Sequence, residues 1–323
     1  MTRAVYVDGQ EGTTGLRIRE VLAGRDDIEV LRIDPDKRKD PAERARLLNE
    51  ADVAFLCLPD PAAREAVAMI RNPSTCVIDA STAHRTAADW VFGLPELARD
   101  QRARIRGSKR IANPGCHSTA FLLLVRPLVD AGLLARSQPI SATSITGYSG
   151  GGRKMIEQYE HSGDAVLRAP RPYALTLAHK HLPEMVTHAG LDVAPVFLPV
   201  VSNYYKGLAV TIPLHLSAFA PGTTAAAVHA CLTRAYAGER FVRVMPLDDP
   251  DTLANGFDVQ ACNDTNRVDI FVFASATQVM LIARLDNLGK GASGAAVQSM
   301  NIHLGLDEGL GLDATATAGG HAR

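Results

Sequence analysis

The residue whose chemistry is easiest to recognise is Cys116, which follows the turn-forming triplet Asn113-Pro114-Gly115. The apolar stretch after it, over residues 120–125, predicts a buried helix that begins near the cysteine. A thiol at a helix N-terminus faces the positive end of the helix dipole, which favours the reactive thiolate. We therefore interpret Cys116 as a nucleophile. The other four cysteines are expected to be buried structural thiols.

A thiol nucleophile needs a proton acceptor, and the segment His179-Lys180-His181-Leu182-Pro183-Glu184 is the densest cluster of titratable residues in the second half of the chain. Either histidine can exchange a proton near neutral pH. Their alternating spacing puts both on one face if the segment is extended. A metal site is conceivable, but no third ligand stands at a recognisable spacing, so we expect no metal.

The elements that must position these residues fall into two groups. In the first third of the chain, strands are predicted over residues 4–7, 28–33, 53–58 and 76–78, with helices over 13–23 and 62–70. Alternating strands and helices are typical of βαβ units. We expect a Rossmann-type α/β domain with a parallel, doubly wound sheet.

The second part of the chain is strand-rich. Strands are predicted over residues 140–145, 194–201, 208–216, 241–245, 268–274 and 279–285, separated by long loops and few helices. This pattern favours an α+β catalytic and oligomerisation domain with a mostly antiparallel sheet, over residues 117–289. A last helix over 292–304 would return to the first domain, assigned to residues 1–116 and 290–323. The tail from Gly305 is expected to be frayed.

A glycine-rich loop follows the first predicted strand, with the spacing G-x-x-G-x-x-G at Gly9, Gly12 and Gly15. Glycines in this position let the backbone approach a pyrophosphate, which the following helix attracts through its free N–H groups. We expect these glycines, with Thr13 and Thr14, to bind a dinucleotide.

The sequence after the second strand leaves the choice of dinucleotide open. Asp34 could accept a hydrogen bond from a ribose 2′-hydroxyl and favour NAD. Lys37-Arg38-Lys39 follow directly, and Arg38 in this basic triplet could neutralise the 2′-phosphate of NADP.

Composition excludes several classes of partner. The chain has 323 residues, 21% of them charged, with a formal net charge of −1, so it lacks the basic excess that nucleic acids and anionic membranes attract. Its five cysteines form no CxxC pair. The sequence shows no signal-peptide pattern and no apolar run of membrane-spanning length. We expect a cytoplasmic protein that acts on a small molecule.

Short blocks across the chain, in the right order, resemble one enzyme family, the shorter type of N-acetyl-γ-glutamyl-phosphate reductase. The blocks are Phe92-Gly93-Leu94-Pro95-Glu96-Leu97, Asn113-Pro114-Gly115-Cys116, Gly147-Tyr148-Ser149-Gly150-Gly151-Gly152-Arg153, His179-Lys180-His181-Leu182-Pro183-Glu184, Asp286-Asn287-Leu288-Gly289-Lys290-Gly291-Ala292-Ser293-Gly294 and Gln298-Ser299-Met300-Asn301.

The resemblance implies a fold shared with aspartate-semialdehyde dehydrogenase, a homodimer or homotetramer, and the acyl phosphate N-acetyl-glutamyl 5-phosphate as substrate in arginine biosynthesis. It implies that Cys116 forms a thioester, that His179 is the acid/base, and that NADP(H) supplies the hydride. The remaining expected contacts fall into two sets. The residues expected to contact the substrate are His181, Arg85, Arg153, Ser149 and Gly150. Those expected to contact the cofactor, besides the glycine loop, are Asp34, Arg38, Ser81, Asn287, Lys290 and Gly291.

Three alternatives remain open from the sequence. The substrate could be aspartyl phosphate or N-acetyl-aminoadipyl phosphate, because pocket length cannot be read from the residues. Cys116 and His179 could also serve a hydrolase or acyltransferase without nucleotide, although the glycine loop argues against it. A nucleotide-sensing protein without chemistry is the third alternative, and the presence of Cys116 and the histidine cluster argues against it.

Overall fold

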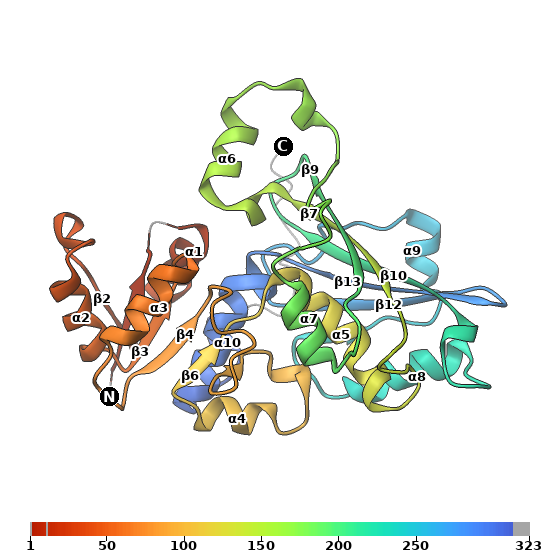
Figure 1. The fold of residues 1–323 in the computed structure, drawn as a ribbon, viewed down its shortest axis with the longest axis horizontal. Helices are drawn as coiled ribbons and strands as arrows, with labels where there is room; N and C mark the ends of the chain where they lie inside the picture. The colour runs from red at the N-terminus through yellow and green to blue at the C-terminus, as the bar shows by residue number, and fades with distance from the viewer. Residues whose placement is uncertain (1, 11, 313–323) are drawn as a thin grey trace. The chain divides into compact units, whose positions relative to one another are not determined.

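The structure, a computed structural model, describes residues 2–10 and 12–312. These residues divide into two compact units, the first made of residues 1–115 and 292–312 and the second of residues 116–291. Among the described residues, no helix combines the length and the apolar character needed to cross a membrane. Figure 1 shows the elements of each unit.

The first unit contains a six-stranded sheet in the order β2-β1-β3-β4-β6-β5, in which every pair of neighbours is parallel. Strands β3 and β4 are completely buried, as expected for a parallel sheet covered by helices. The predicted Rossmann-type sheet is thus confirmed. The strands are β1 (Arg3–Asp8), β2 (Ile28–Leu31), β3 (Val53–Leu56), β4 (Cys76–Asp79), β5 (Val91–Phe92) and β6 (Arg110–Ala112).

Helices α1 (Thr13–Ala23) and α3 (Asp60–Met69) match the two helices predicted in this unit. Helix α2 (Pro41–Glu50) was not predicted, because Leu47 and Leu48 are its only large apolar residues and the only ones it buries. Its N-terminus is fixed by Asp40, whose carboxylate accepts hydrogen bonds from two backbone N–H groups of the first turn. The unit also contains α4 (Gln101–Gly107) and short 3₁₀ turns at Pro35–Lys37 and Pro95–Leu97.

The last helix, α10 (Gly294–Leu304), belongs to the first unit and contacts α1, α4 and β4. The expectation that the tail frays from Gly305 onward is wrong for residues 305–312. Glu308 binds the guanidinium of Arg102 at 2.8 Å, and its carboxylate also accepts a hydrogen bond from Gln298 at 2.7 Å. These long-range contacts hold the segment on α4 and α10. Residues 313–323 of the predicted tail lie outside the described residues.

The second unit contains a seven-stranded sheet in the order β11-β12-β13-β10-β7-β9-β8. The pairs β7–β9 and β11–β12 are parallel and the other four are antiparallel, which confirms the expected mostly antiparallel sheet. The strands are β7 (Ser141–Gly147), β8 (Arg171–Pro172), β9 (Val196–Ser202), β10 (Leu208–His215), β11 (Val242–Val244), β12 (Val268–Ala274) and β13 (Gln278–Leu285).

One face of this sheet is covered by helices. Helix α5 (Cys116–Asp130) contacts β10 and β13, and α7 (Leu182–Ala189) and α8 (Ala225–Ala235) pack against α5. The four helices α6 to α9 were not predicted individually. Two of them, α6 (Gly152–His161) and α9 (Pro250–Asn255), bury no side chain. Figure 1 shows α6 standing away from α5 and α7, beyond the ends of β7 and β9.

The opposite face of the sheet is partly bare. Strand residues that alternate with the buried ones point away from α5 and leave large apolar side chains in contact with solvent. These are Ile145 (39% exposed), Val196 (56%), Leu198 (40%) and Met280 (39%). At the β12 end, Phe257 and Met245 cover the same face by packing against Phe271 and Ile282.

Candidate active site

Cys116 is the first residue of α5, which confirms that a helix begins at this cysteine. Its surroundings are tight on one side. A Cβ at Gly291 would lie 2.7 Å from the Cβ of Cys116 and 3.1 Å from the carbonyl oxygen of Asp286. Only glycine therefore fits at position 291. Gly291 lies in a π-helical turn, Gly289–Ser293, which follows β13. Its N–H donates to the carbonyl of Asp286 at 2.9 Å.

His179 and His181 lie in the same unit and contact each other directly. Their ring centroids are 4.7 Å apart and their planes nearly perpendicular. The backbone N–H of His181 donates to Nδ1 of His179 at 3.2 Å. An extended segment would have put both histidines on one face. The segment is not extended, however, and turns directly into α7. Both side chains are buried, and Nε2 of His181 lies 3.9 Å from a carboxylate oxygen of Glu184.

A third histidine, His117, lies in this cluster and was not considered from the sequence. Its ring centroid is 5.4 Å from that of His179 and 5.4 Å from that of His181. Its Nδ1 lies 2.8 Å from the Ser144 hydroxyl oxygen, and its Nε2 lies 3.0 Å from the hydroxyl of Tyr173. Burial, helped by the neighbouring His179 and Lys180, lowers the pKa of His117 to about 3. The ring is therefore neutral at physiological pH.

Tyr173 is the second residue that the sequence did not reveal. It follows the short strand β8, and its ring lies 5.8 Å from that of His179. Burial raises the pKa of the Tyr173 phenol, and the negative charge of the Cys116 thiolate raises it further. The phenol thus keeps its proton near neutral pH. The position of Cys116 directly before His117 could have suggested that His117 belongs to the site, but no sequence signal pointed to Tyr173.

Ser149, Gly150 and Asn287, all predicted to contact ligands, are joined by hydrogen bonds or close packing. Nδ2 of Asn287 donates to the Ser149 hydroxyl at 2.9 Å, and its Oδ1 accepts from the backbone N–H of Gly207 at 2.8 Å. A Cβ at Gly150 would lie 3.6 Å from the Asn287 amide. Asn287 therefore holds the turn that starts after β7.

Lys290, a predicted cofactor residue, is completely buried, and its ammonium lies 5.8 Å from the centre of the Phe241 ring. Arg153, a predicted substrate residue, lies instead on the surface of α6. Its side chain is 73% exposed and pairs with Glu157 at 2.8 Å. The buried histidine cluster thus does not include Arg153.

Arg85, the other predicted anion-binding residue, belongs to the first unit. Its guanidinium donates to the carbonyl oxygen of Asn113 at 2.9 Å and to that of Ala80 at 3.1 Å. It thereby supports the backbone three residues before Cys116. Nδ2 of Asn113 in turn donates to the carbonyl of Ala292 at 3.0 Å.

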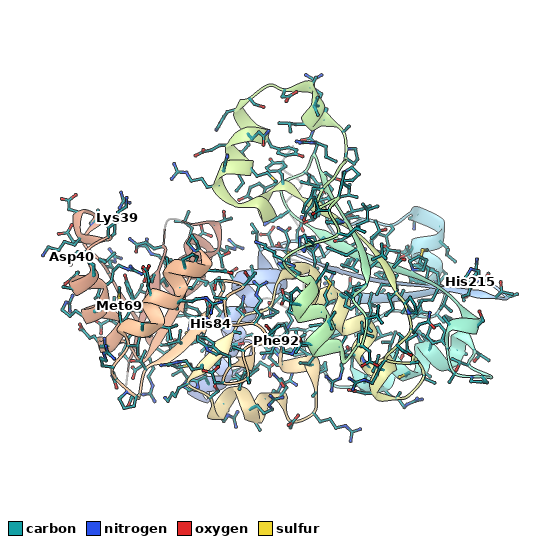
Figure 2. The ribbon with its side chains drawn as sticks, viewed as in Figure 1. Lys39, Asp40, Met69, His84, Phe92 and His215 are labelled. Atoms are coloured by element: carbon teal, nitrogen blue, oxygen red, sulfur yellow. The ribbon has the colours of Figure 1, made fainter. Side chains whose placement is uncertain are left out.

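The glycine loop of the first unit borders a cavity of about 250 Å³. The cavity is lined by Asp8 and Gly9 from the end of β1 and by Arg38, Lys39 and Arg44. Gly9 has a φ of +85°, and a Cβ there would collide with the carbonyl of Cys57. Arg44 of α2 binds the buried Asp8 at 2.8 Å. Figure 2 shows Lys39 on the turn before α2.

The other residues of the loop lie at the start of α1. Gly12 precedes the helix, and Thr13, Thr14 and Gly15 form its first turn. A Cβ at Gly15 would lie 2.6 Å from the carbonyl oxygen of Gly9. Glycine at these positions therefore lets the loop fold back on itself, with its N–H groups at the helix N-terminus.

Asp34 and Ser81, both predicted to bind the cofactor, have intramolecular partners. Asp34 is exposed and accepts a hydrogen bond from the backbone of Asp36, which caps a 3₁₀ turn. Ser81 donates to the buried Asp79 at 2.7 Å, and His84 lies 2.6 Å from the same carboxylate. His84 also stacks on Trp90. Figure 2 marks the position of His84 in the first unit.

Of the four other cysteines, all expected to be buried, Cys76, Cys231 and Cys262 are buried, whereas Cys57 is partly exposed. Burial raises the pKa of the Cys57 and Cys76 thiols to about 12, and burial with the nearby Asp269 raises that of Cys262 to about 11. Burial also raises the pKa of Cys231. These four thiols stay protonated near neutral pH.

Comparison with known proteins agrees with the two-unit architecture. Residues 4–105 match the family model described as "Semialdehyde dehydrogenase, NAD binding domain", and residues 116–287 match "Semialdehyde dehydrogenase, dimerisation domain". Among solved structures, aspartate semialdehyde dehydrogenase II of Vibrio cholerae, complexed with ASA, superposes with a TM-score of 0.71, covering 94% of this chain and 98% of that one. At 17% identity this likeness shows the fold alone.

Curated relatives are much more similar in sequence. The N-acetyl-gamma-glutamyl-phosphate reductase of Burkholderia lata is 50% identical over 304 residues, which are 93% of this chain and 96% of the relative. The N-acetyl-gamma-glutamyl-phosphate reductase 2 of a Nostoc species is 47% identical over 317 residues, covering 95% of this chain and 98% of the relative. Identity at this level across both units shows that the chain belongs to the N-acetyl-gamma-glutamyl-phosphate reductase family.

Proposed function

We propose that this protein reduces N-acetyl-glutamyl 5-phosphate to N-acetyl-glutamate 5-semialdehyde and phosphate, with NADPH as the reductant, in arginine biosynthesis. The observation that carries the proposal is the position of Cys116 at the first residue of α5, in the unit that also holds the buried His179 and His181. The names of the curated relatives supply the substrate.

The first step uses the thiolate of Cys116. Its sulfur attacks the acyl carbon of the substrate, the bond from this carbon to the phosphate oxygen breaks, and inorganic phosphate leaves. The product is a thioester on Cys116. A thioester accepts hydride more readily than a carboxylate does, so this covalent step prepares the carbonyl for reduction.

The cofactor, when bound, would supply the hydride for the thioester carbonyl, which then carries an oxyanion. His179 in its protonated form donates a proton to this oxygen and so gives the thiohemiacetal. His179 then takes the same proton back as the carbon–sulfur bond breaks, so that the aldehyde leaves and the thiolate is regenerated. His181, held near Glu184, contacts the substrate. Ser149 and Gly150 would border the substrate, since Asn287 holds their turn.

The first unit suits a dinucleotide. Its Gly9 and Gly15 leave space that a Cβ would fill, and the loop ends at the N-terminus of α1. Arg38 and Lys39 line the cavity, whereas Asp34 caps a neighbouring turn, and this favours the 2′-phosphate of NADP over the free hydroxyl of NAD. Thr13, Thr14, Ser81, Lys290 and Gly291 remain proposed cofactor contacts.

We further propose that the protein forms a homodimer through the bare face of the seven-stranded sheet. The exposed Ile145, Val196, Leu198 and Met280 support this, because a second copy would remove their apolar surface from water. The description of the matching family model as a dimerisation domain points the same way.

The test is NADP-linked oxidation of N-acetyl-glutamate semialdehyde in the presence of phosphate, followed at the nicotinamide absorbance. Phosphate-dependent reduction of NADP with this aldehyde, and not with aspartate semialdehyde, is the expected result. Cys116→Ser should abolish it and leave nucleotide binding intact. Ordinary turnover by that variant would rule out the thioester route. Activity with aspartate semialdehyde alone would show that the substrate is aspartyl phosphate.

The two histidines are separated by their kinetic effects. His179→Ala should lower kcat strongly, because the thiohemiacetal loses its proton acceptor. His181→Ala should chiefly raise KM. The reverse pattern would exchange the two roles.

A further inference from the structure

Cys116 and His117 are consecutive residues in the first turn of α5, yet their environments differ. Cys116 is partly exposed, whereas only 3% of His117 is exposed. The His117 ring lies on the face of the sheet formed by β7 and β9, where Phe197 packs against it at 5.3 Å between ring centroids. The turn thus presents the thiol to the surface of the unit and buries the imidazole behind it.

The two nitrogens of His117 join two hydroxyl groups from separate segments. Nδ1 lies 2.8 Å from the hydroxyl oxygen of Ser144, a fully buried residue of β7, and Nε2 lies 3.0 Å from the hydroxyl of Tyr173. Since a neutral imidazole donates with one nitrogen and accepts with the other, the three side chains form a hydrogen-bonded row with a single direction.

We propose that His117 is a positioning residue, which directs the hydroxyl proton of Tyr173 toward the sulfur of Cys116 so that the phenol stabilises the thiolate. In this arrangement Ser144 donates to Nδ1, Nε2–H donates to the Tyr173 oxygen, and the Tyr173 hydroxyl donates to Sγ. Each hydrogen bond in such a row polarises the next. The inference rests on the proposed function, because it assigns the row to the thiol that forms the thioester.

The electrostatics of the cluster fit a row of neutral donors. Burial keeps His117 uncharged, so it does not compete with His179 as the acid/base. The pKa of Tyr173 is raised by burial and by the charge on Cys116, so the phenol retains the proton it must donate. The geometry brings the phenol to the first turn of α5, because its oxygen lies 3.0 Å from Nε2 of His117, the residue that follows Cys116.

The titratable groups around His117 come from one loop and the start of α7. His179 and His181 face its ring, and Glu184 lies beside His181 at 3.9 Å. Lys180 contributes positive charge that disfavours protonation of His117. His179 and His181 remain unchanged in the variants described next, so the row can be tested separately from them.

The opposite direction of the row has the opposite consequence. If Tyr173 donated to Nε2, its oxygen would face the sulfur only as an acceptor and would stabilise the protonated thiol. Removing the Tyr173 hydroxyl would then make the thiolate easier to form. The sign of the change therefore decides between the two directions.

The experiment is the rate of alkylation of the full-length protein by iodoacetamide as a function of pH, without substrate or nucleotide. Cys116→Ser gives the background from the other four cysteines, of which three are buried and all have a raised pKa. Tyr173→Phe should alkylate about tenfold more slowly at pH 7, with the midpoint of the profile about one pH unit higher. Above the midpoint the rate should equal or exceed that of the unaltered protein, because a thiolate without a hydrogen bond is more nucleophilic.

His117→Phe should reproduce this profile, and the double variant should change no further, since both substitutions remove the same hydrogen bond to sulfur. Tyr236→Phe is the matched control. It also removes a buried hydroxyl, one that donates to the carbonyl of Leu123 at 2.6 Å, and it should leave the profile unchanged. If His117→Phe does not fold, His117→Asn replaces it.

An unchanged or lower midpoint in Tyr173→Phe would overturn the proposal, as would a His117 variant that alkylates like the unaltered protein. Alkylation does not depend on the substrate. A protein inactive toward N-acetyl-glutamate semialdehyde would therefore refute the proposed function, while the alkylation profile would still report whether the row acts on the thiol.

Discussion

Gly291 lies against Cys116 so closely that no larger residue fits: a Cβ at position 291 would stand 2.7 Å from the Cβ of the cysteine. The two residues come from the turn after β13 and from the start of α5, 175 positions apart in sequence (291 − 116). The turn that carries Gly291 thus forms one wall beside the nucleophile.

Gly291→Ala should therefore displace the thiol rather than unfold the protein. We expect kcat to fall by about tenfold or more, because misplacing a reacting group by about 1 Å can cost 10²-fold in rate. Steady-state kinetics with thermal melting measures this. Gly107→Ala, where nothing lies within 4 Å of the added methyl group, is the control. Full activity of Gly291→Ala would mean that the turn shifts to accommodate the methyl group without displacing the thiol.

The basic side chains at the nucleotide cavity should determine the choice of cofactor. Arg38→Gln and Lys39→Gln should each raise the Kd of NADPH several-fold and leave that of NADH nearly unchanged, because only NADPH carries the 2′-phosphate. Fluorescence titration measures both constants. Arg32→Gln, on the exposed surface before these residues, controls for a general loss of positive charge. An equal rise in the Kd of both nucleotides would show that Arg38 and Lys39 do not contact the 2′-phosphate.

Burial of His117 should make stability depend on pH. Its pKa is about 3 in the folded protein and 6.5 in an unfolded chain, so only the unfolded chain takes up the proton between these values. The stabilisation is fully present above pH 6.5 and is lost as the pH falls toward 3, at up to about 1.4 kcal/mol per pH unit.

Urea unfolding of the unaltered protein and of His117→Phe, compared at several pH values, isolates this contribution. Carboxylates titrate in the same range in both proteins, so the difference between the two curves reports His117. The difference should change steadily between pH 6 and 4. Parallel curves would mean that the imidazole is protonated in the folded state.

The bare face of the sheet should hold the dimer together. Leu198→Glu would place a charge among the exposed apolar side chains of β7, β9 and β13, and burying an unpaired charge is strongly unfavourable. Light scattering during size-exclusion chromatography should then report a monomer. Leu310→Glu, on an equally exposed leucine of the first unit, should remain dimeric. A dimeric Leu198→Glu protein would show that the dimer interface does not lie on this face of the sheet.

Local signals in the sequence were sufficient for much of the fold. Strand β12 and helix α1 begin and end at the predicted residues, since a run of apolar residues marks the strand and a glycine on each side marks the ends of the helix. Helix α2 shows the limit of this reasoning. Its two buried leucines give too weak a periodicity, and its N-cap, Asp40, has the same sequence appearance as a residue in a surface turn.

The residues of the candidate site also fall into two groups, those that the sequence predicted and those that only the structure revealed. The sequence by itself determined that a cysteine stands at the start of a buried helix, that two histidines follow in one segment, and that a glycine loop joins the first strand to the first helix. Each of these depends on neighbours within a few residues. Local chemistry is sufficient to recognise them.

Only the tertiary structure decided which distant residues accompany the thiol. Ser144 and Tyr173 meet His117 because a strand and an irregular loop converge on the first turn of α5, and no local pattern encodes that convergence. The structure likewise placed Arg153 on the exposed surface of α6 and bound residues 305–312 to the first unit. Contacts between segments far apart in the chain depend on how whole helices and strands pack against one another. No short stretch of the sequence therefore predicts them.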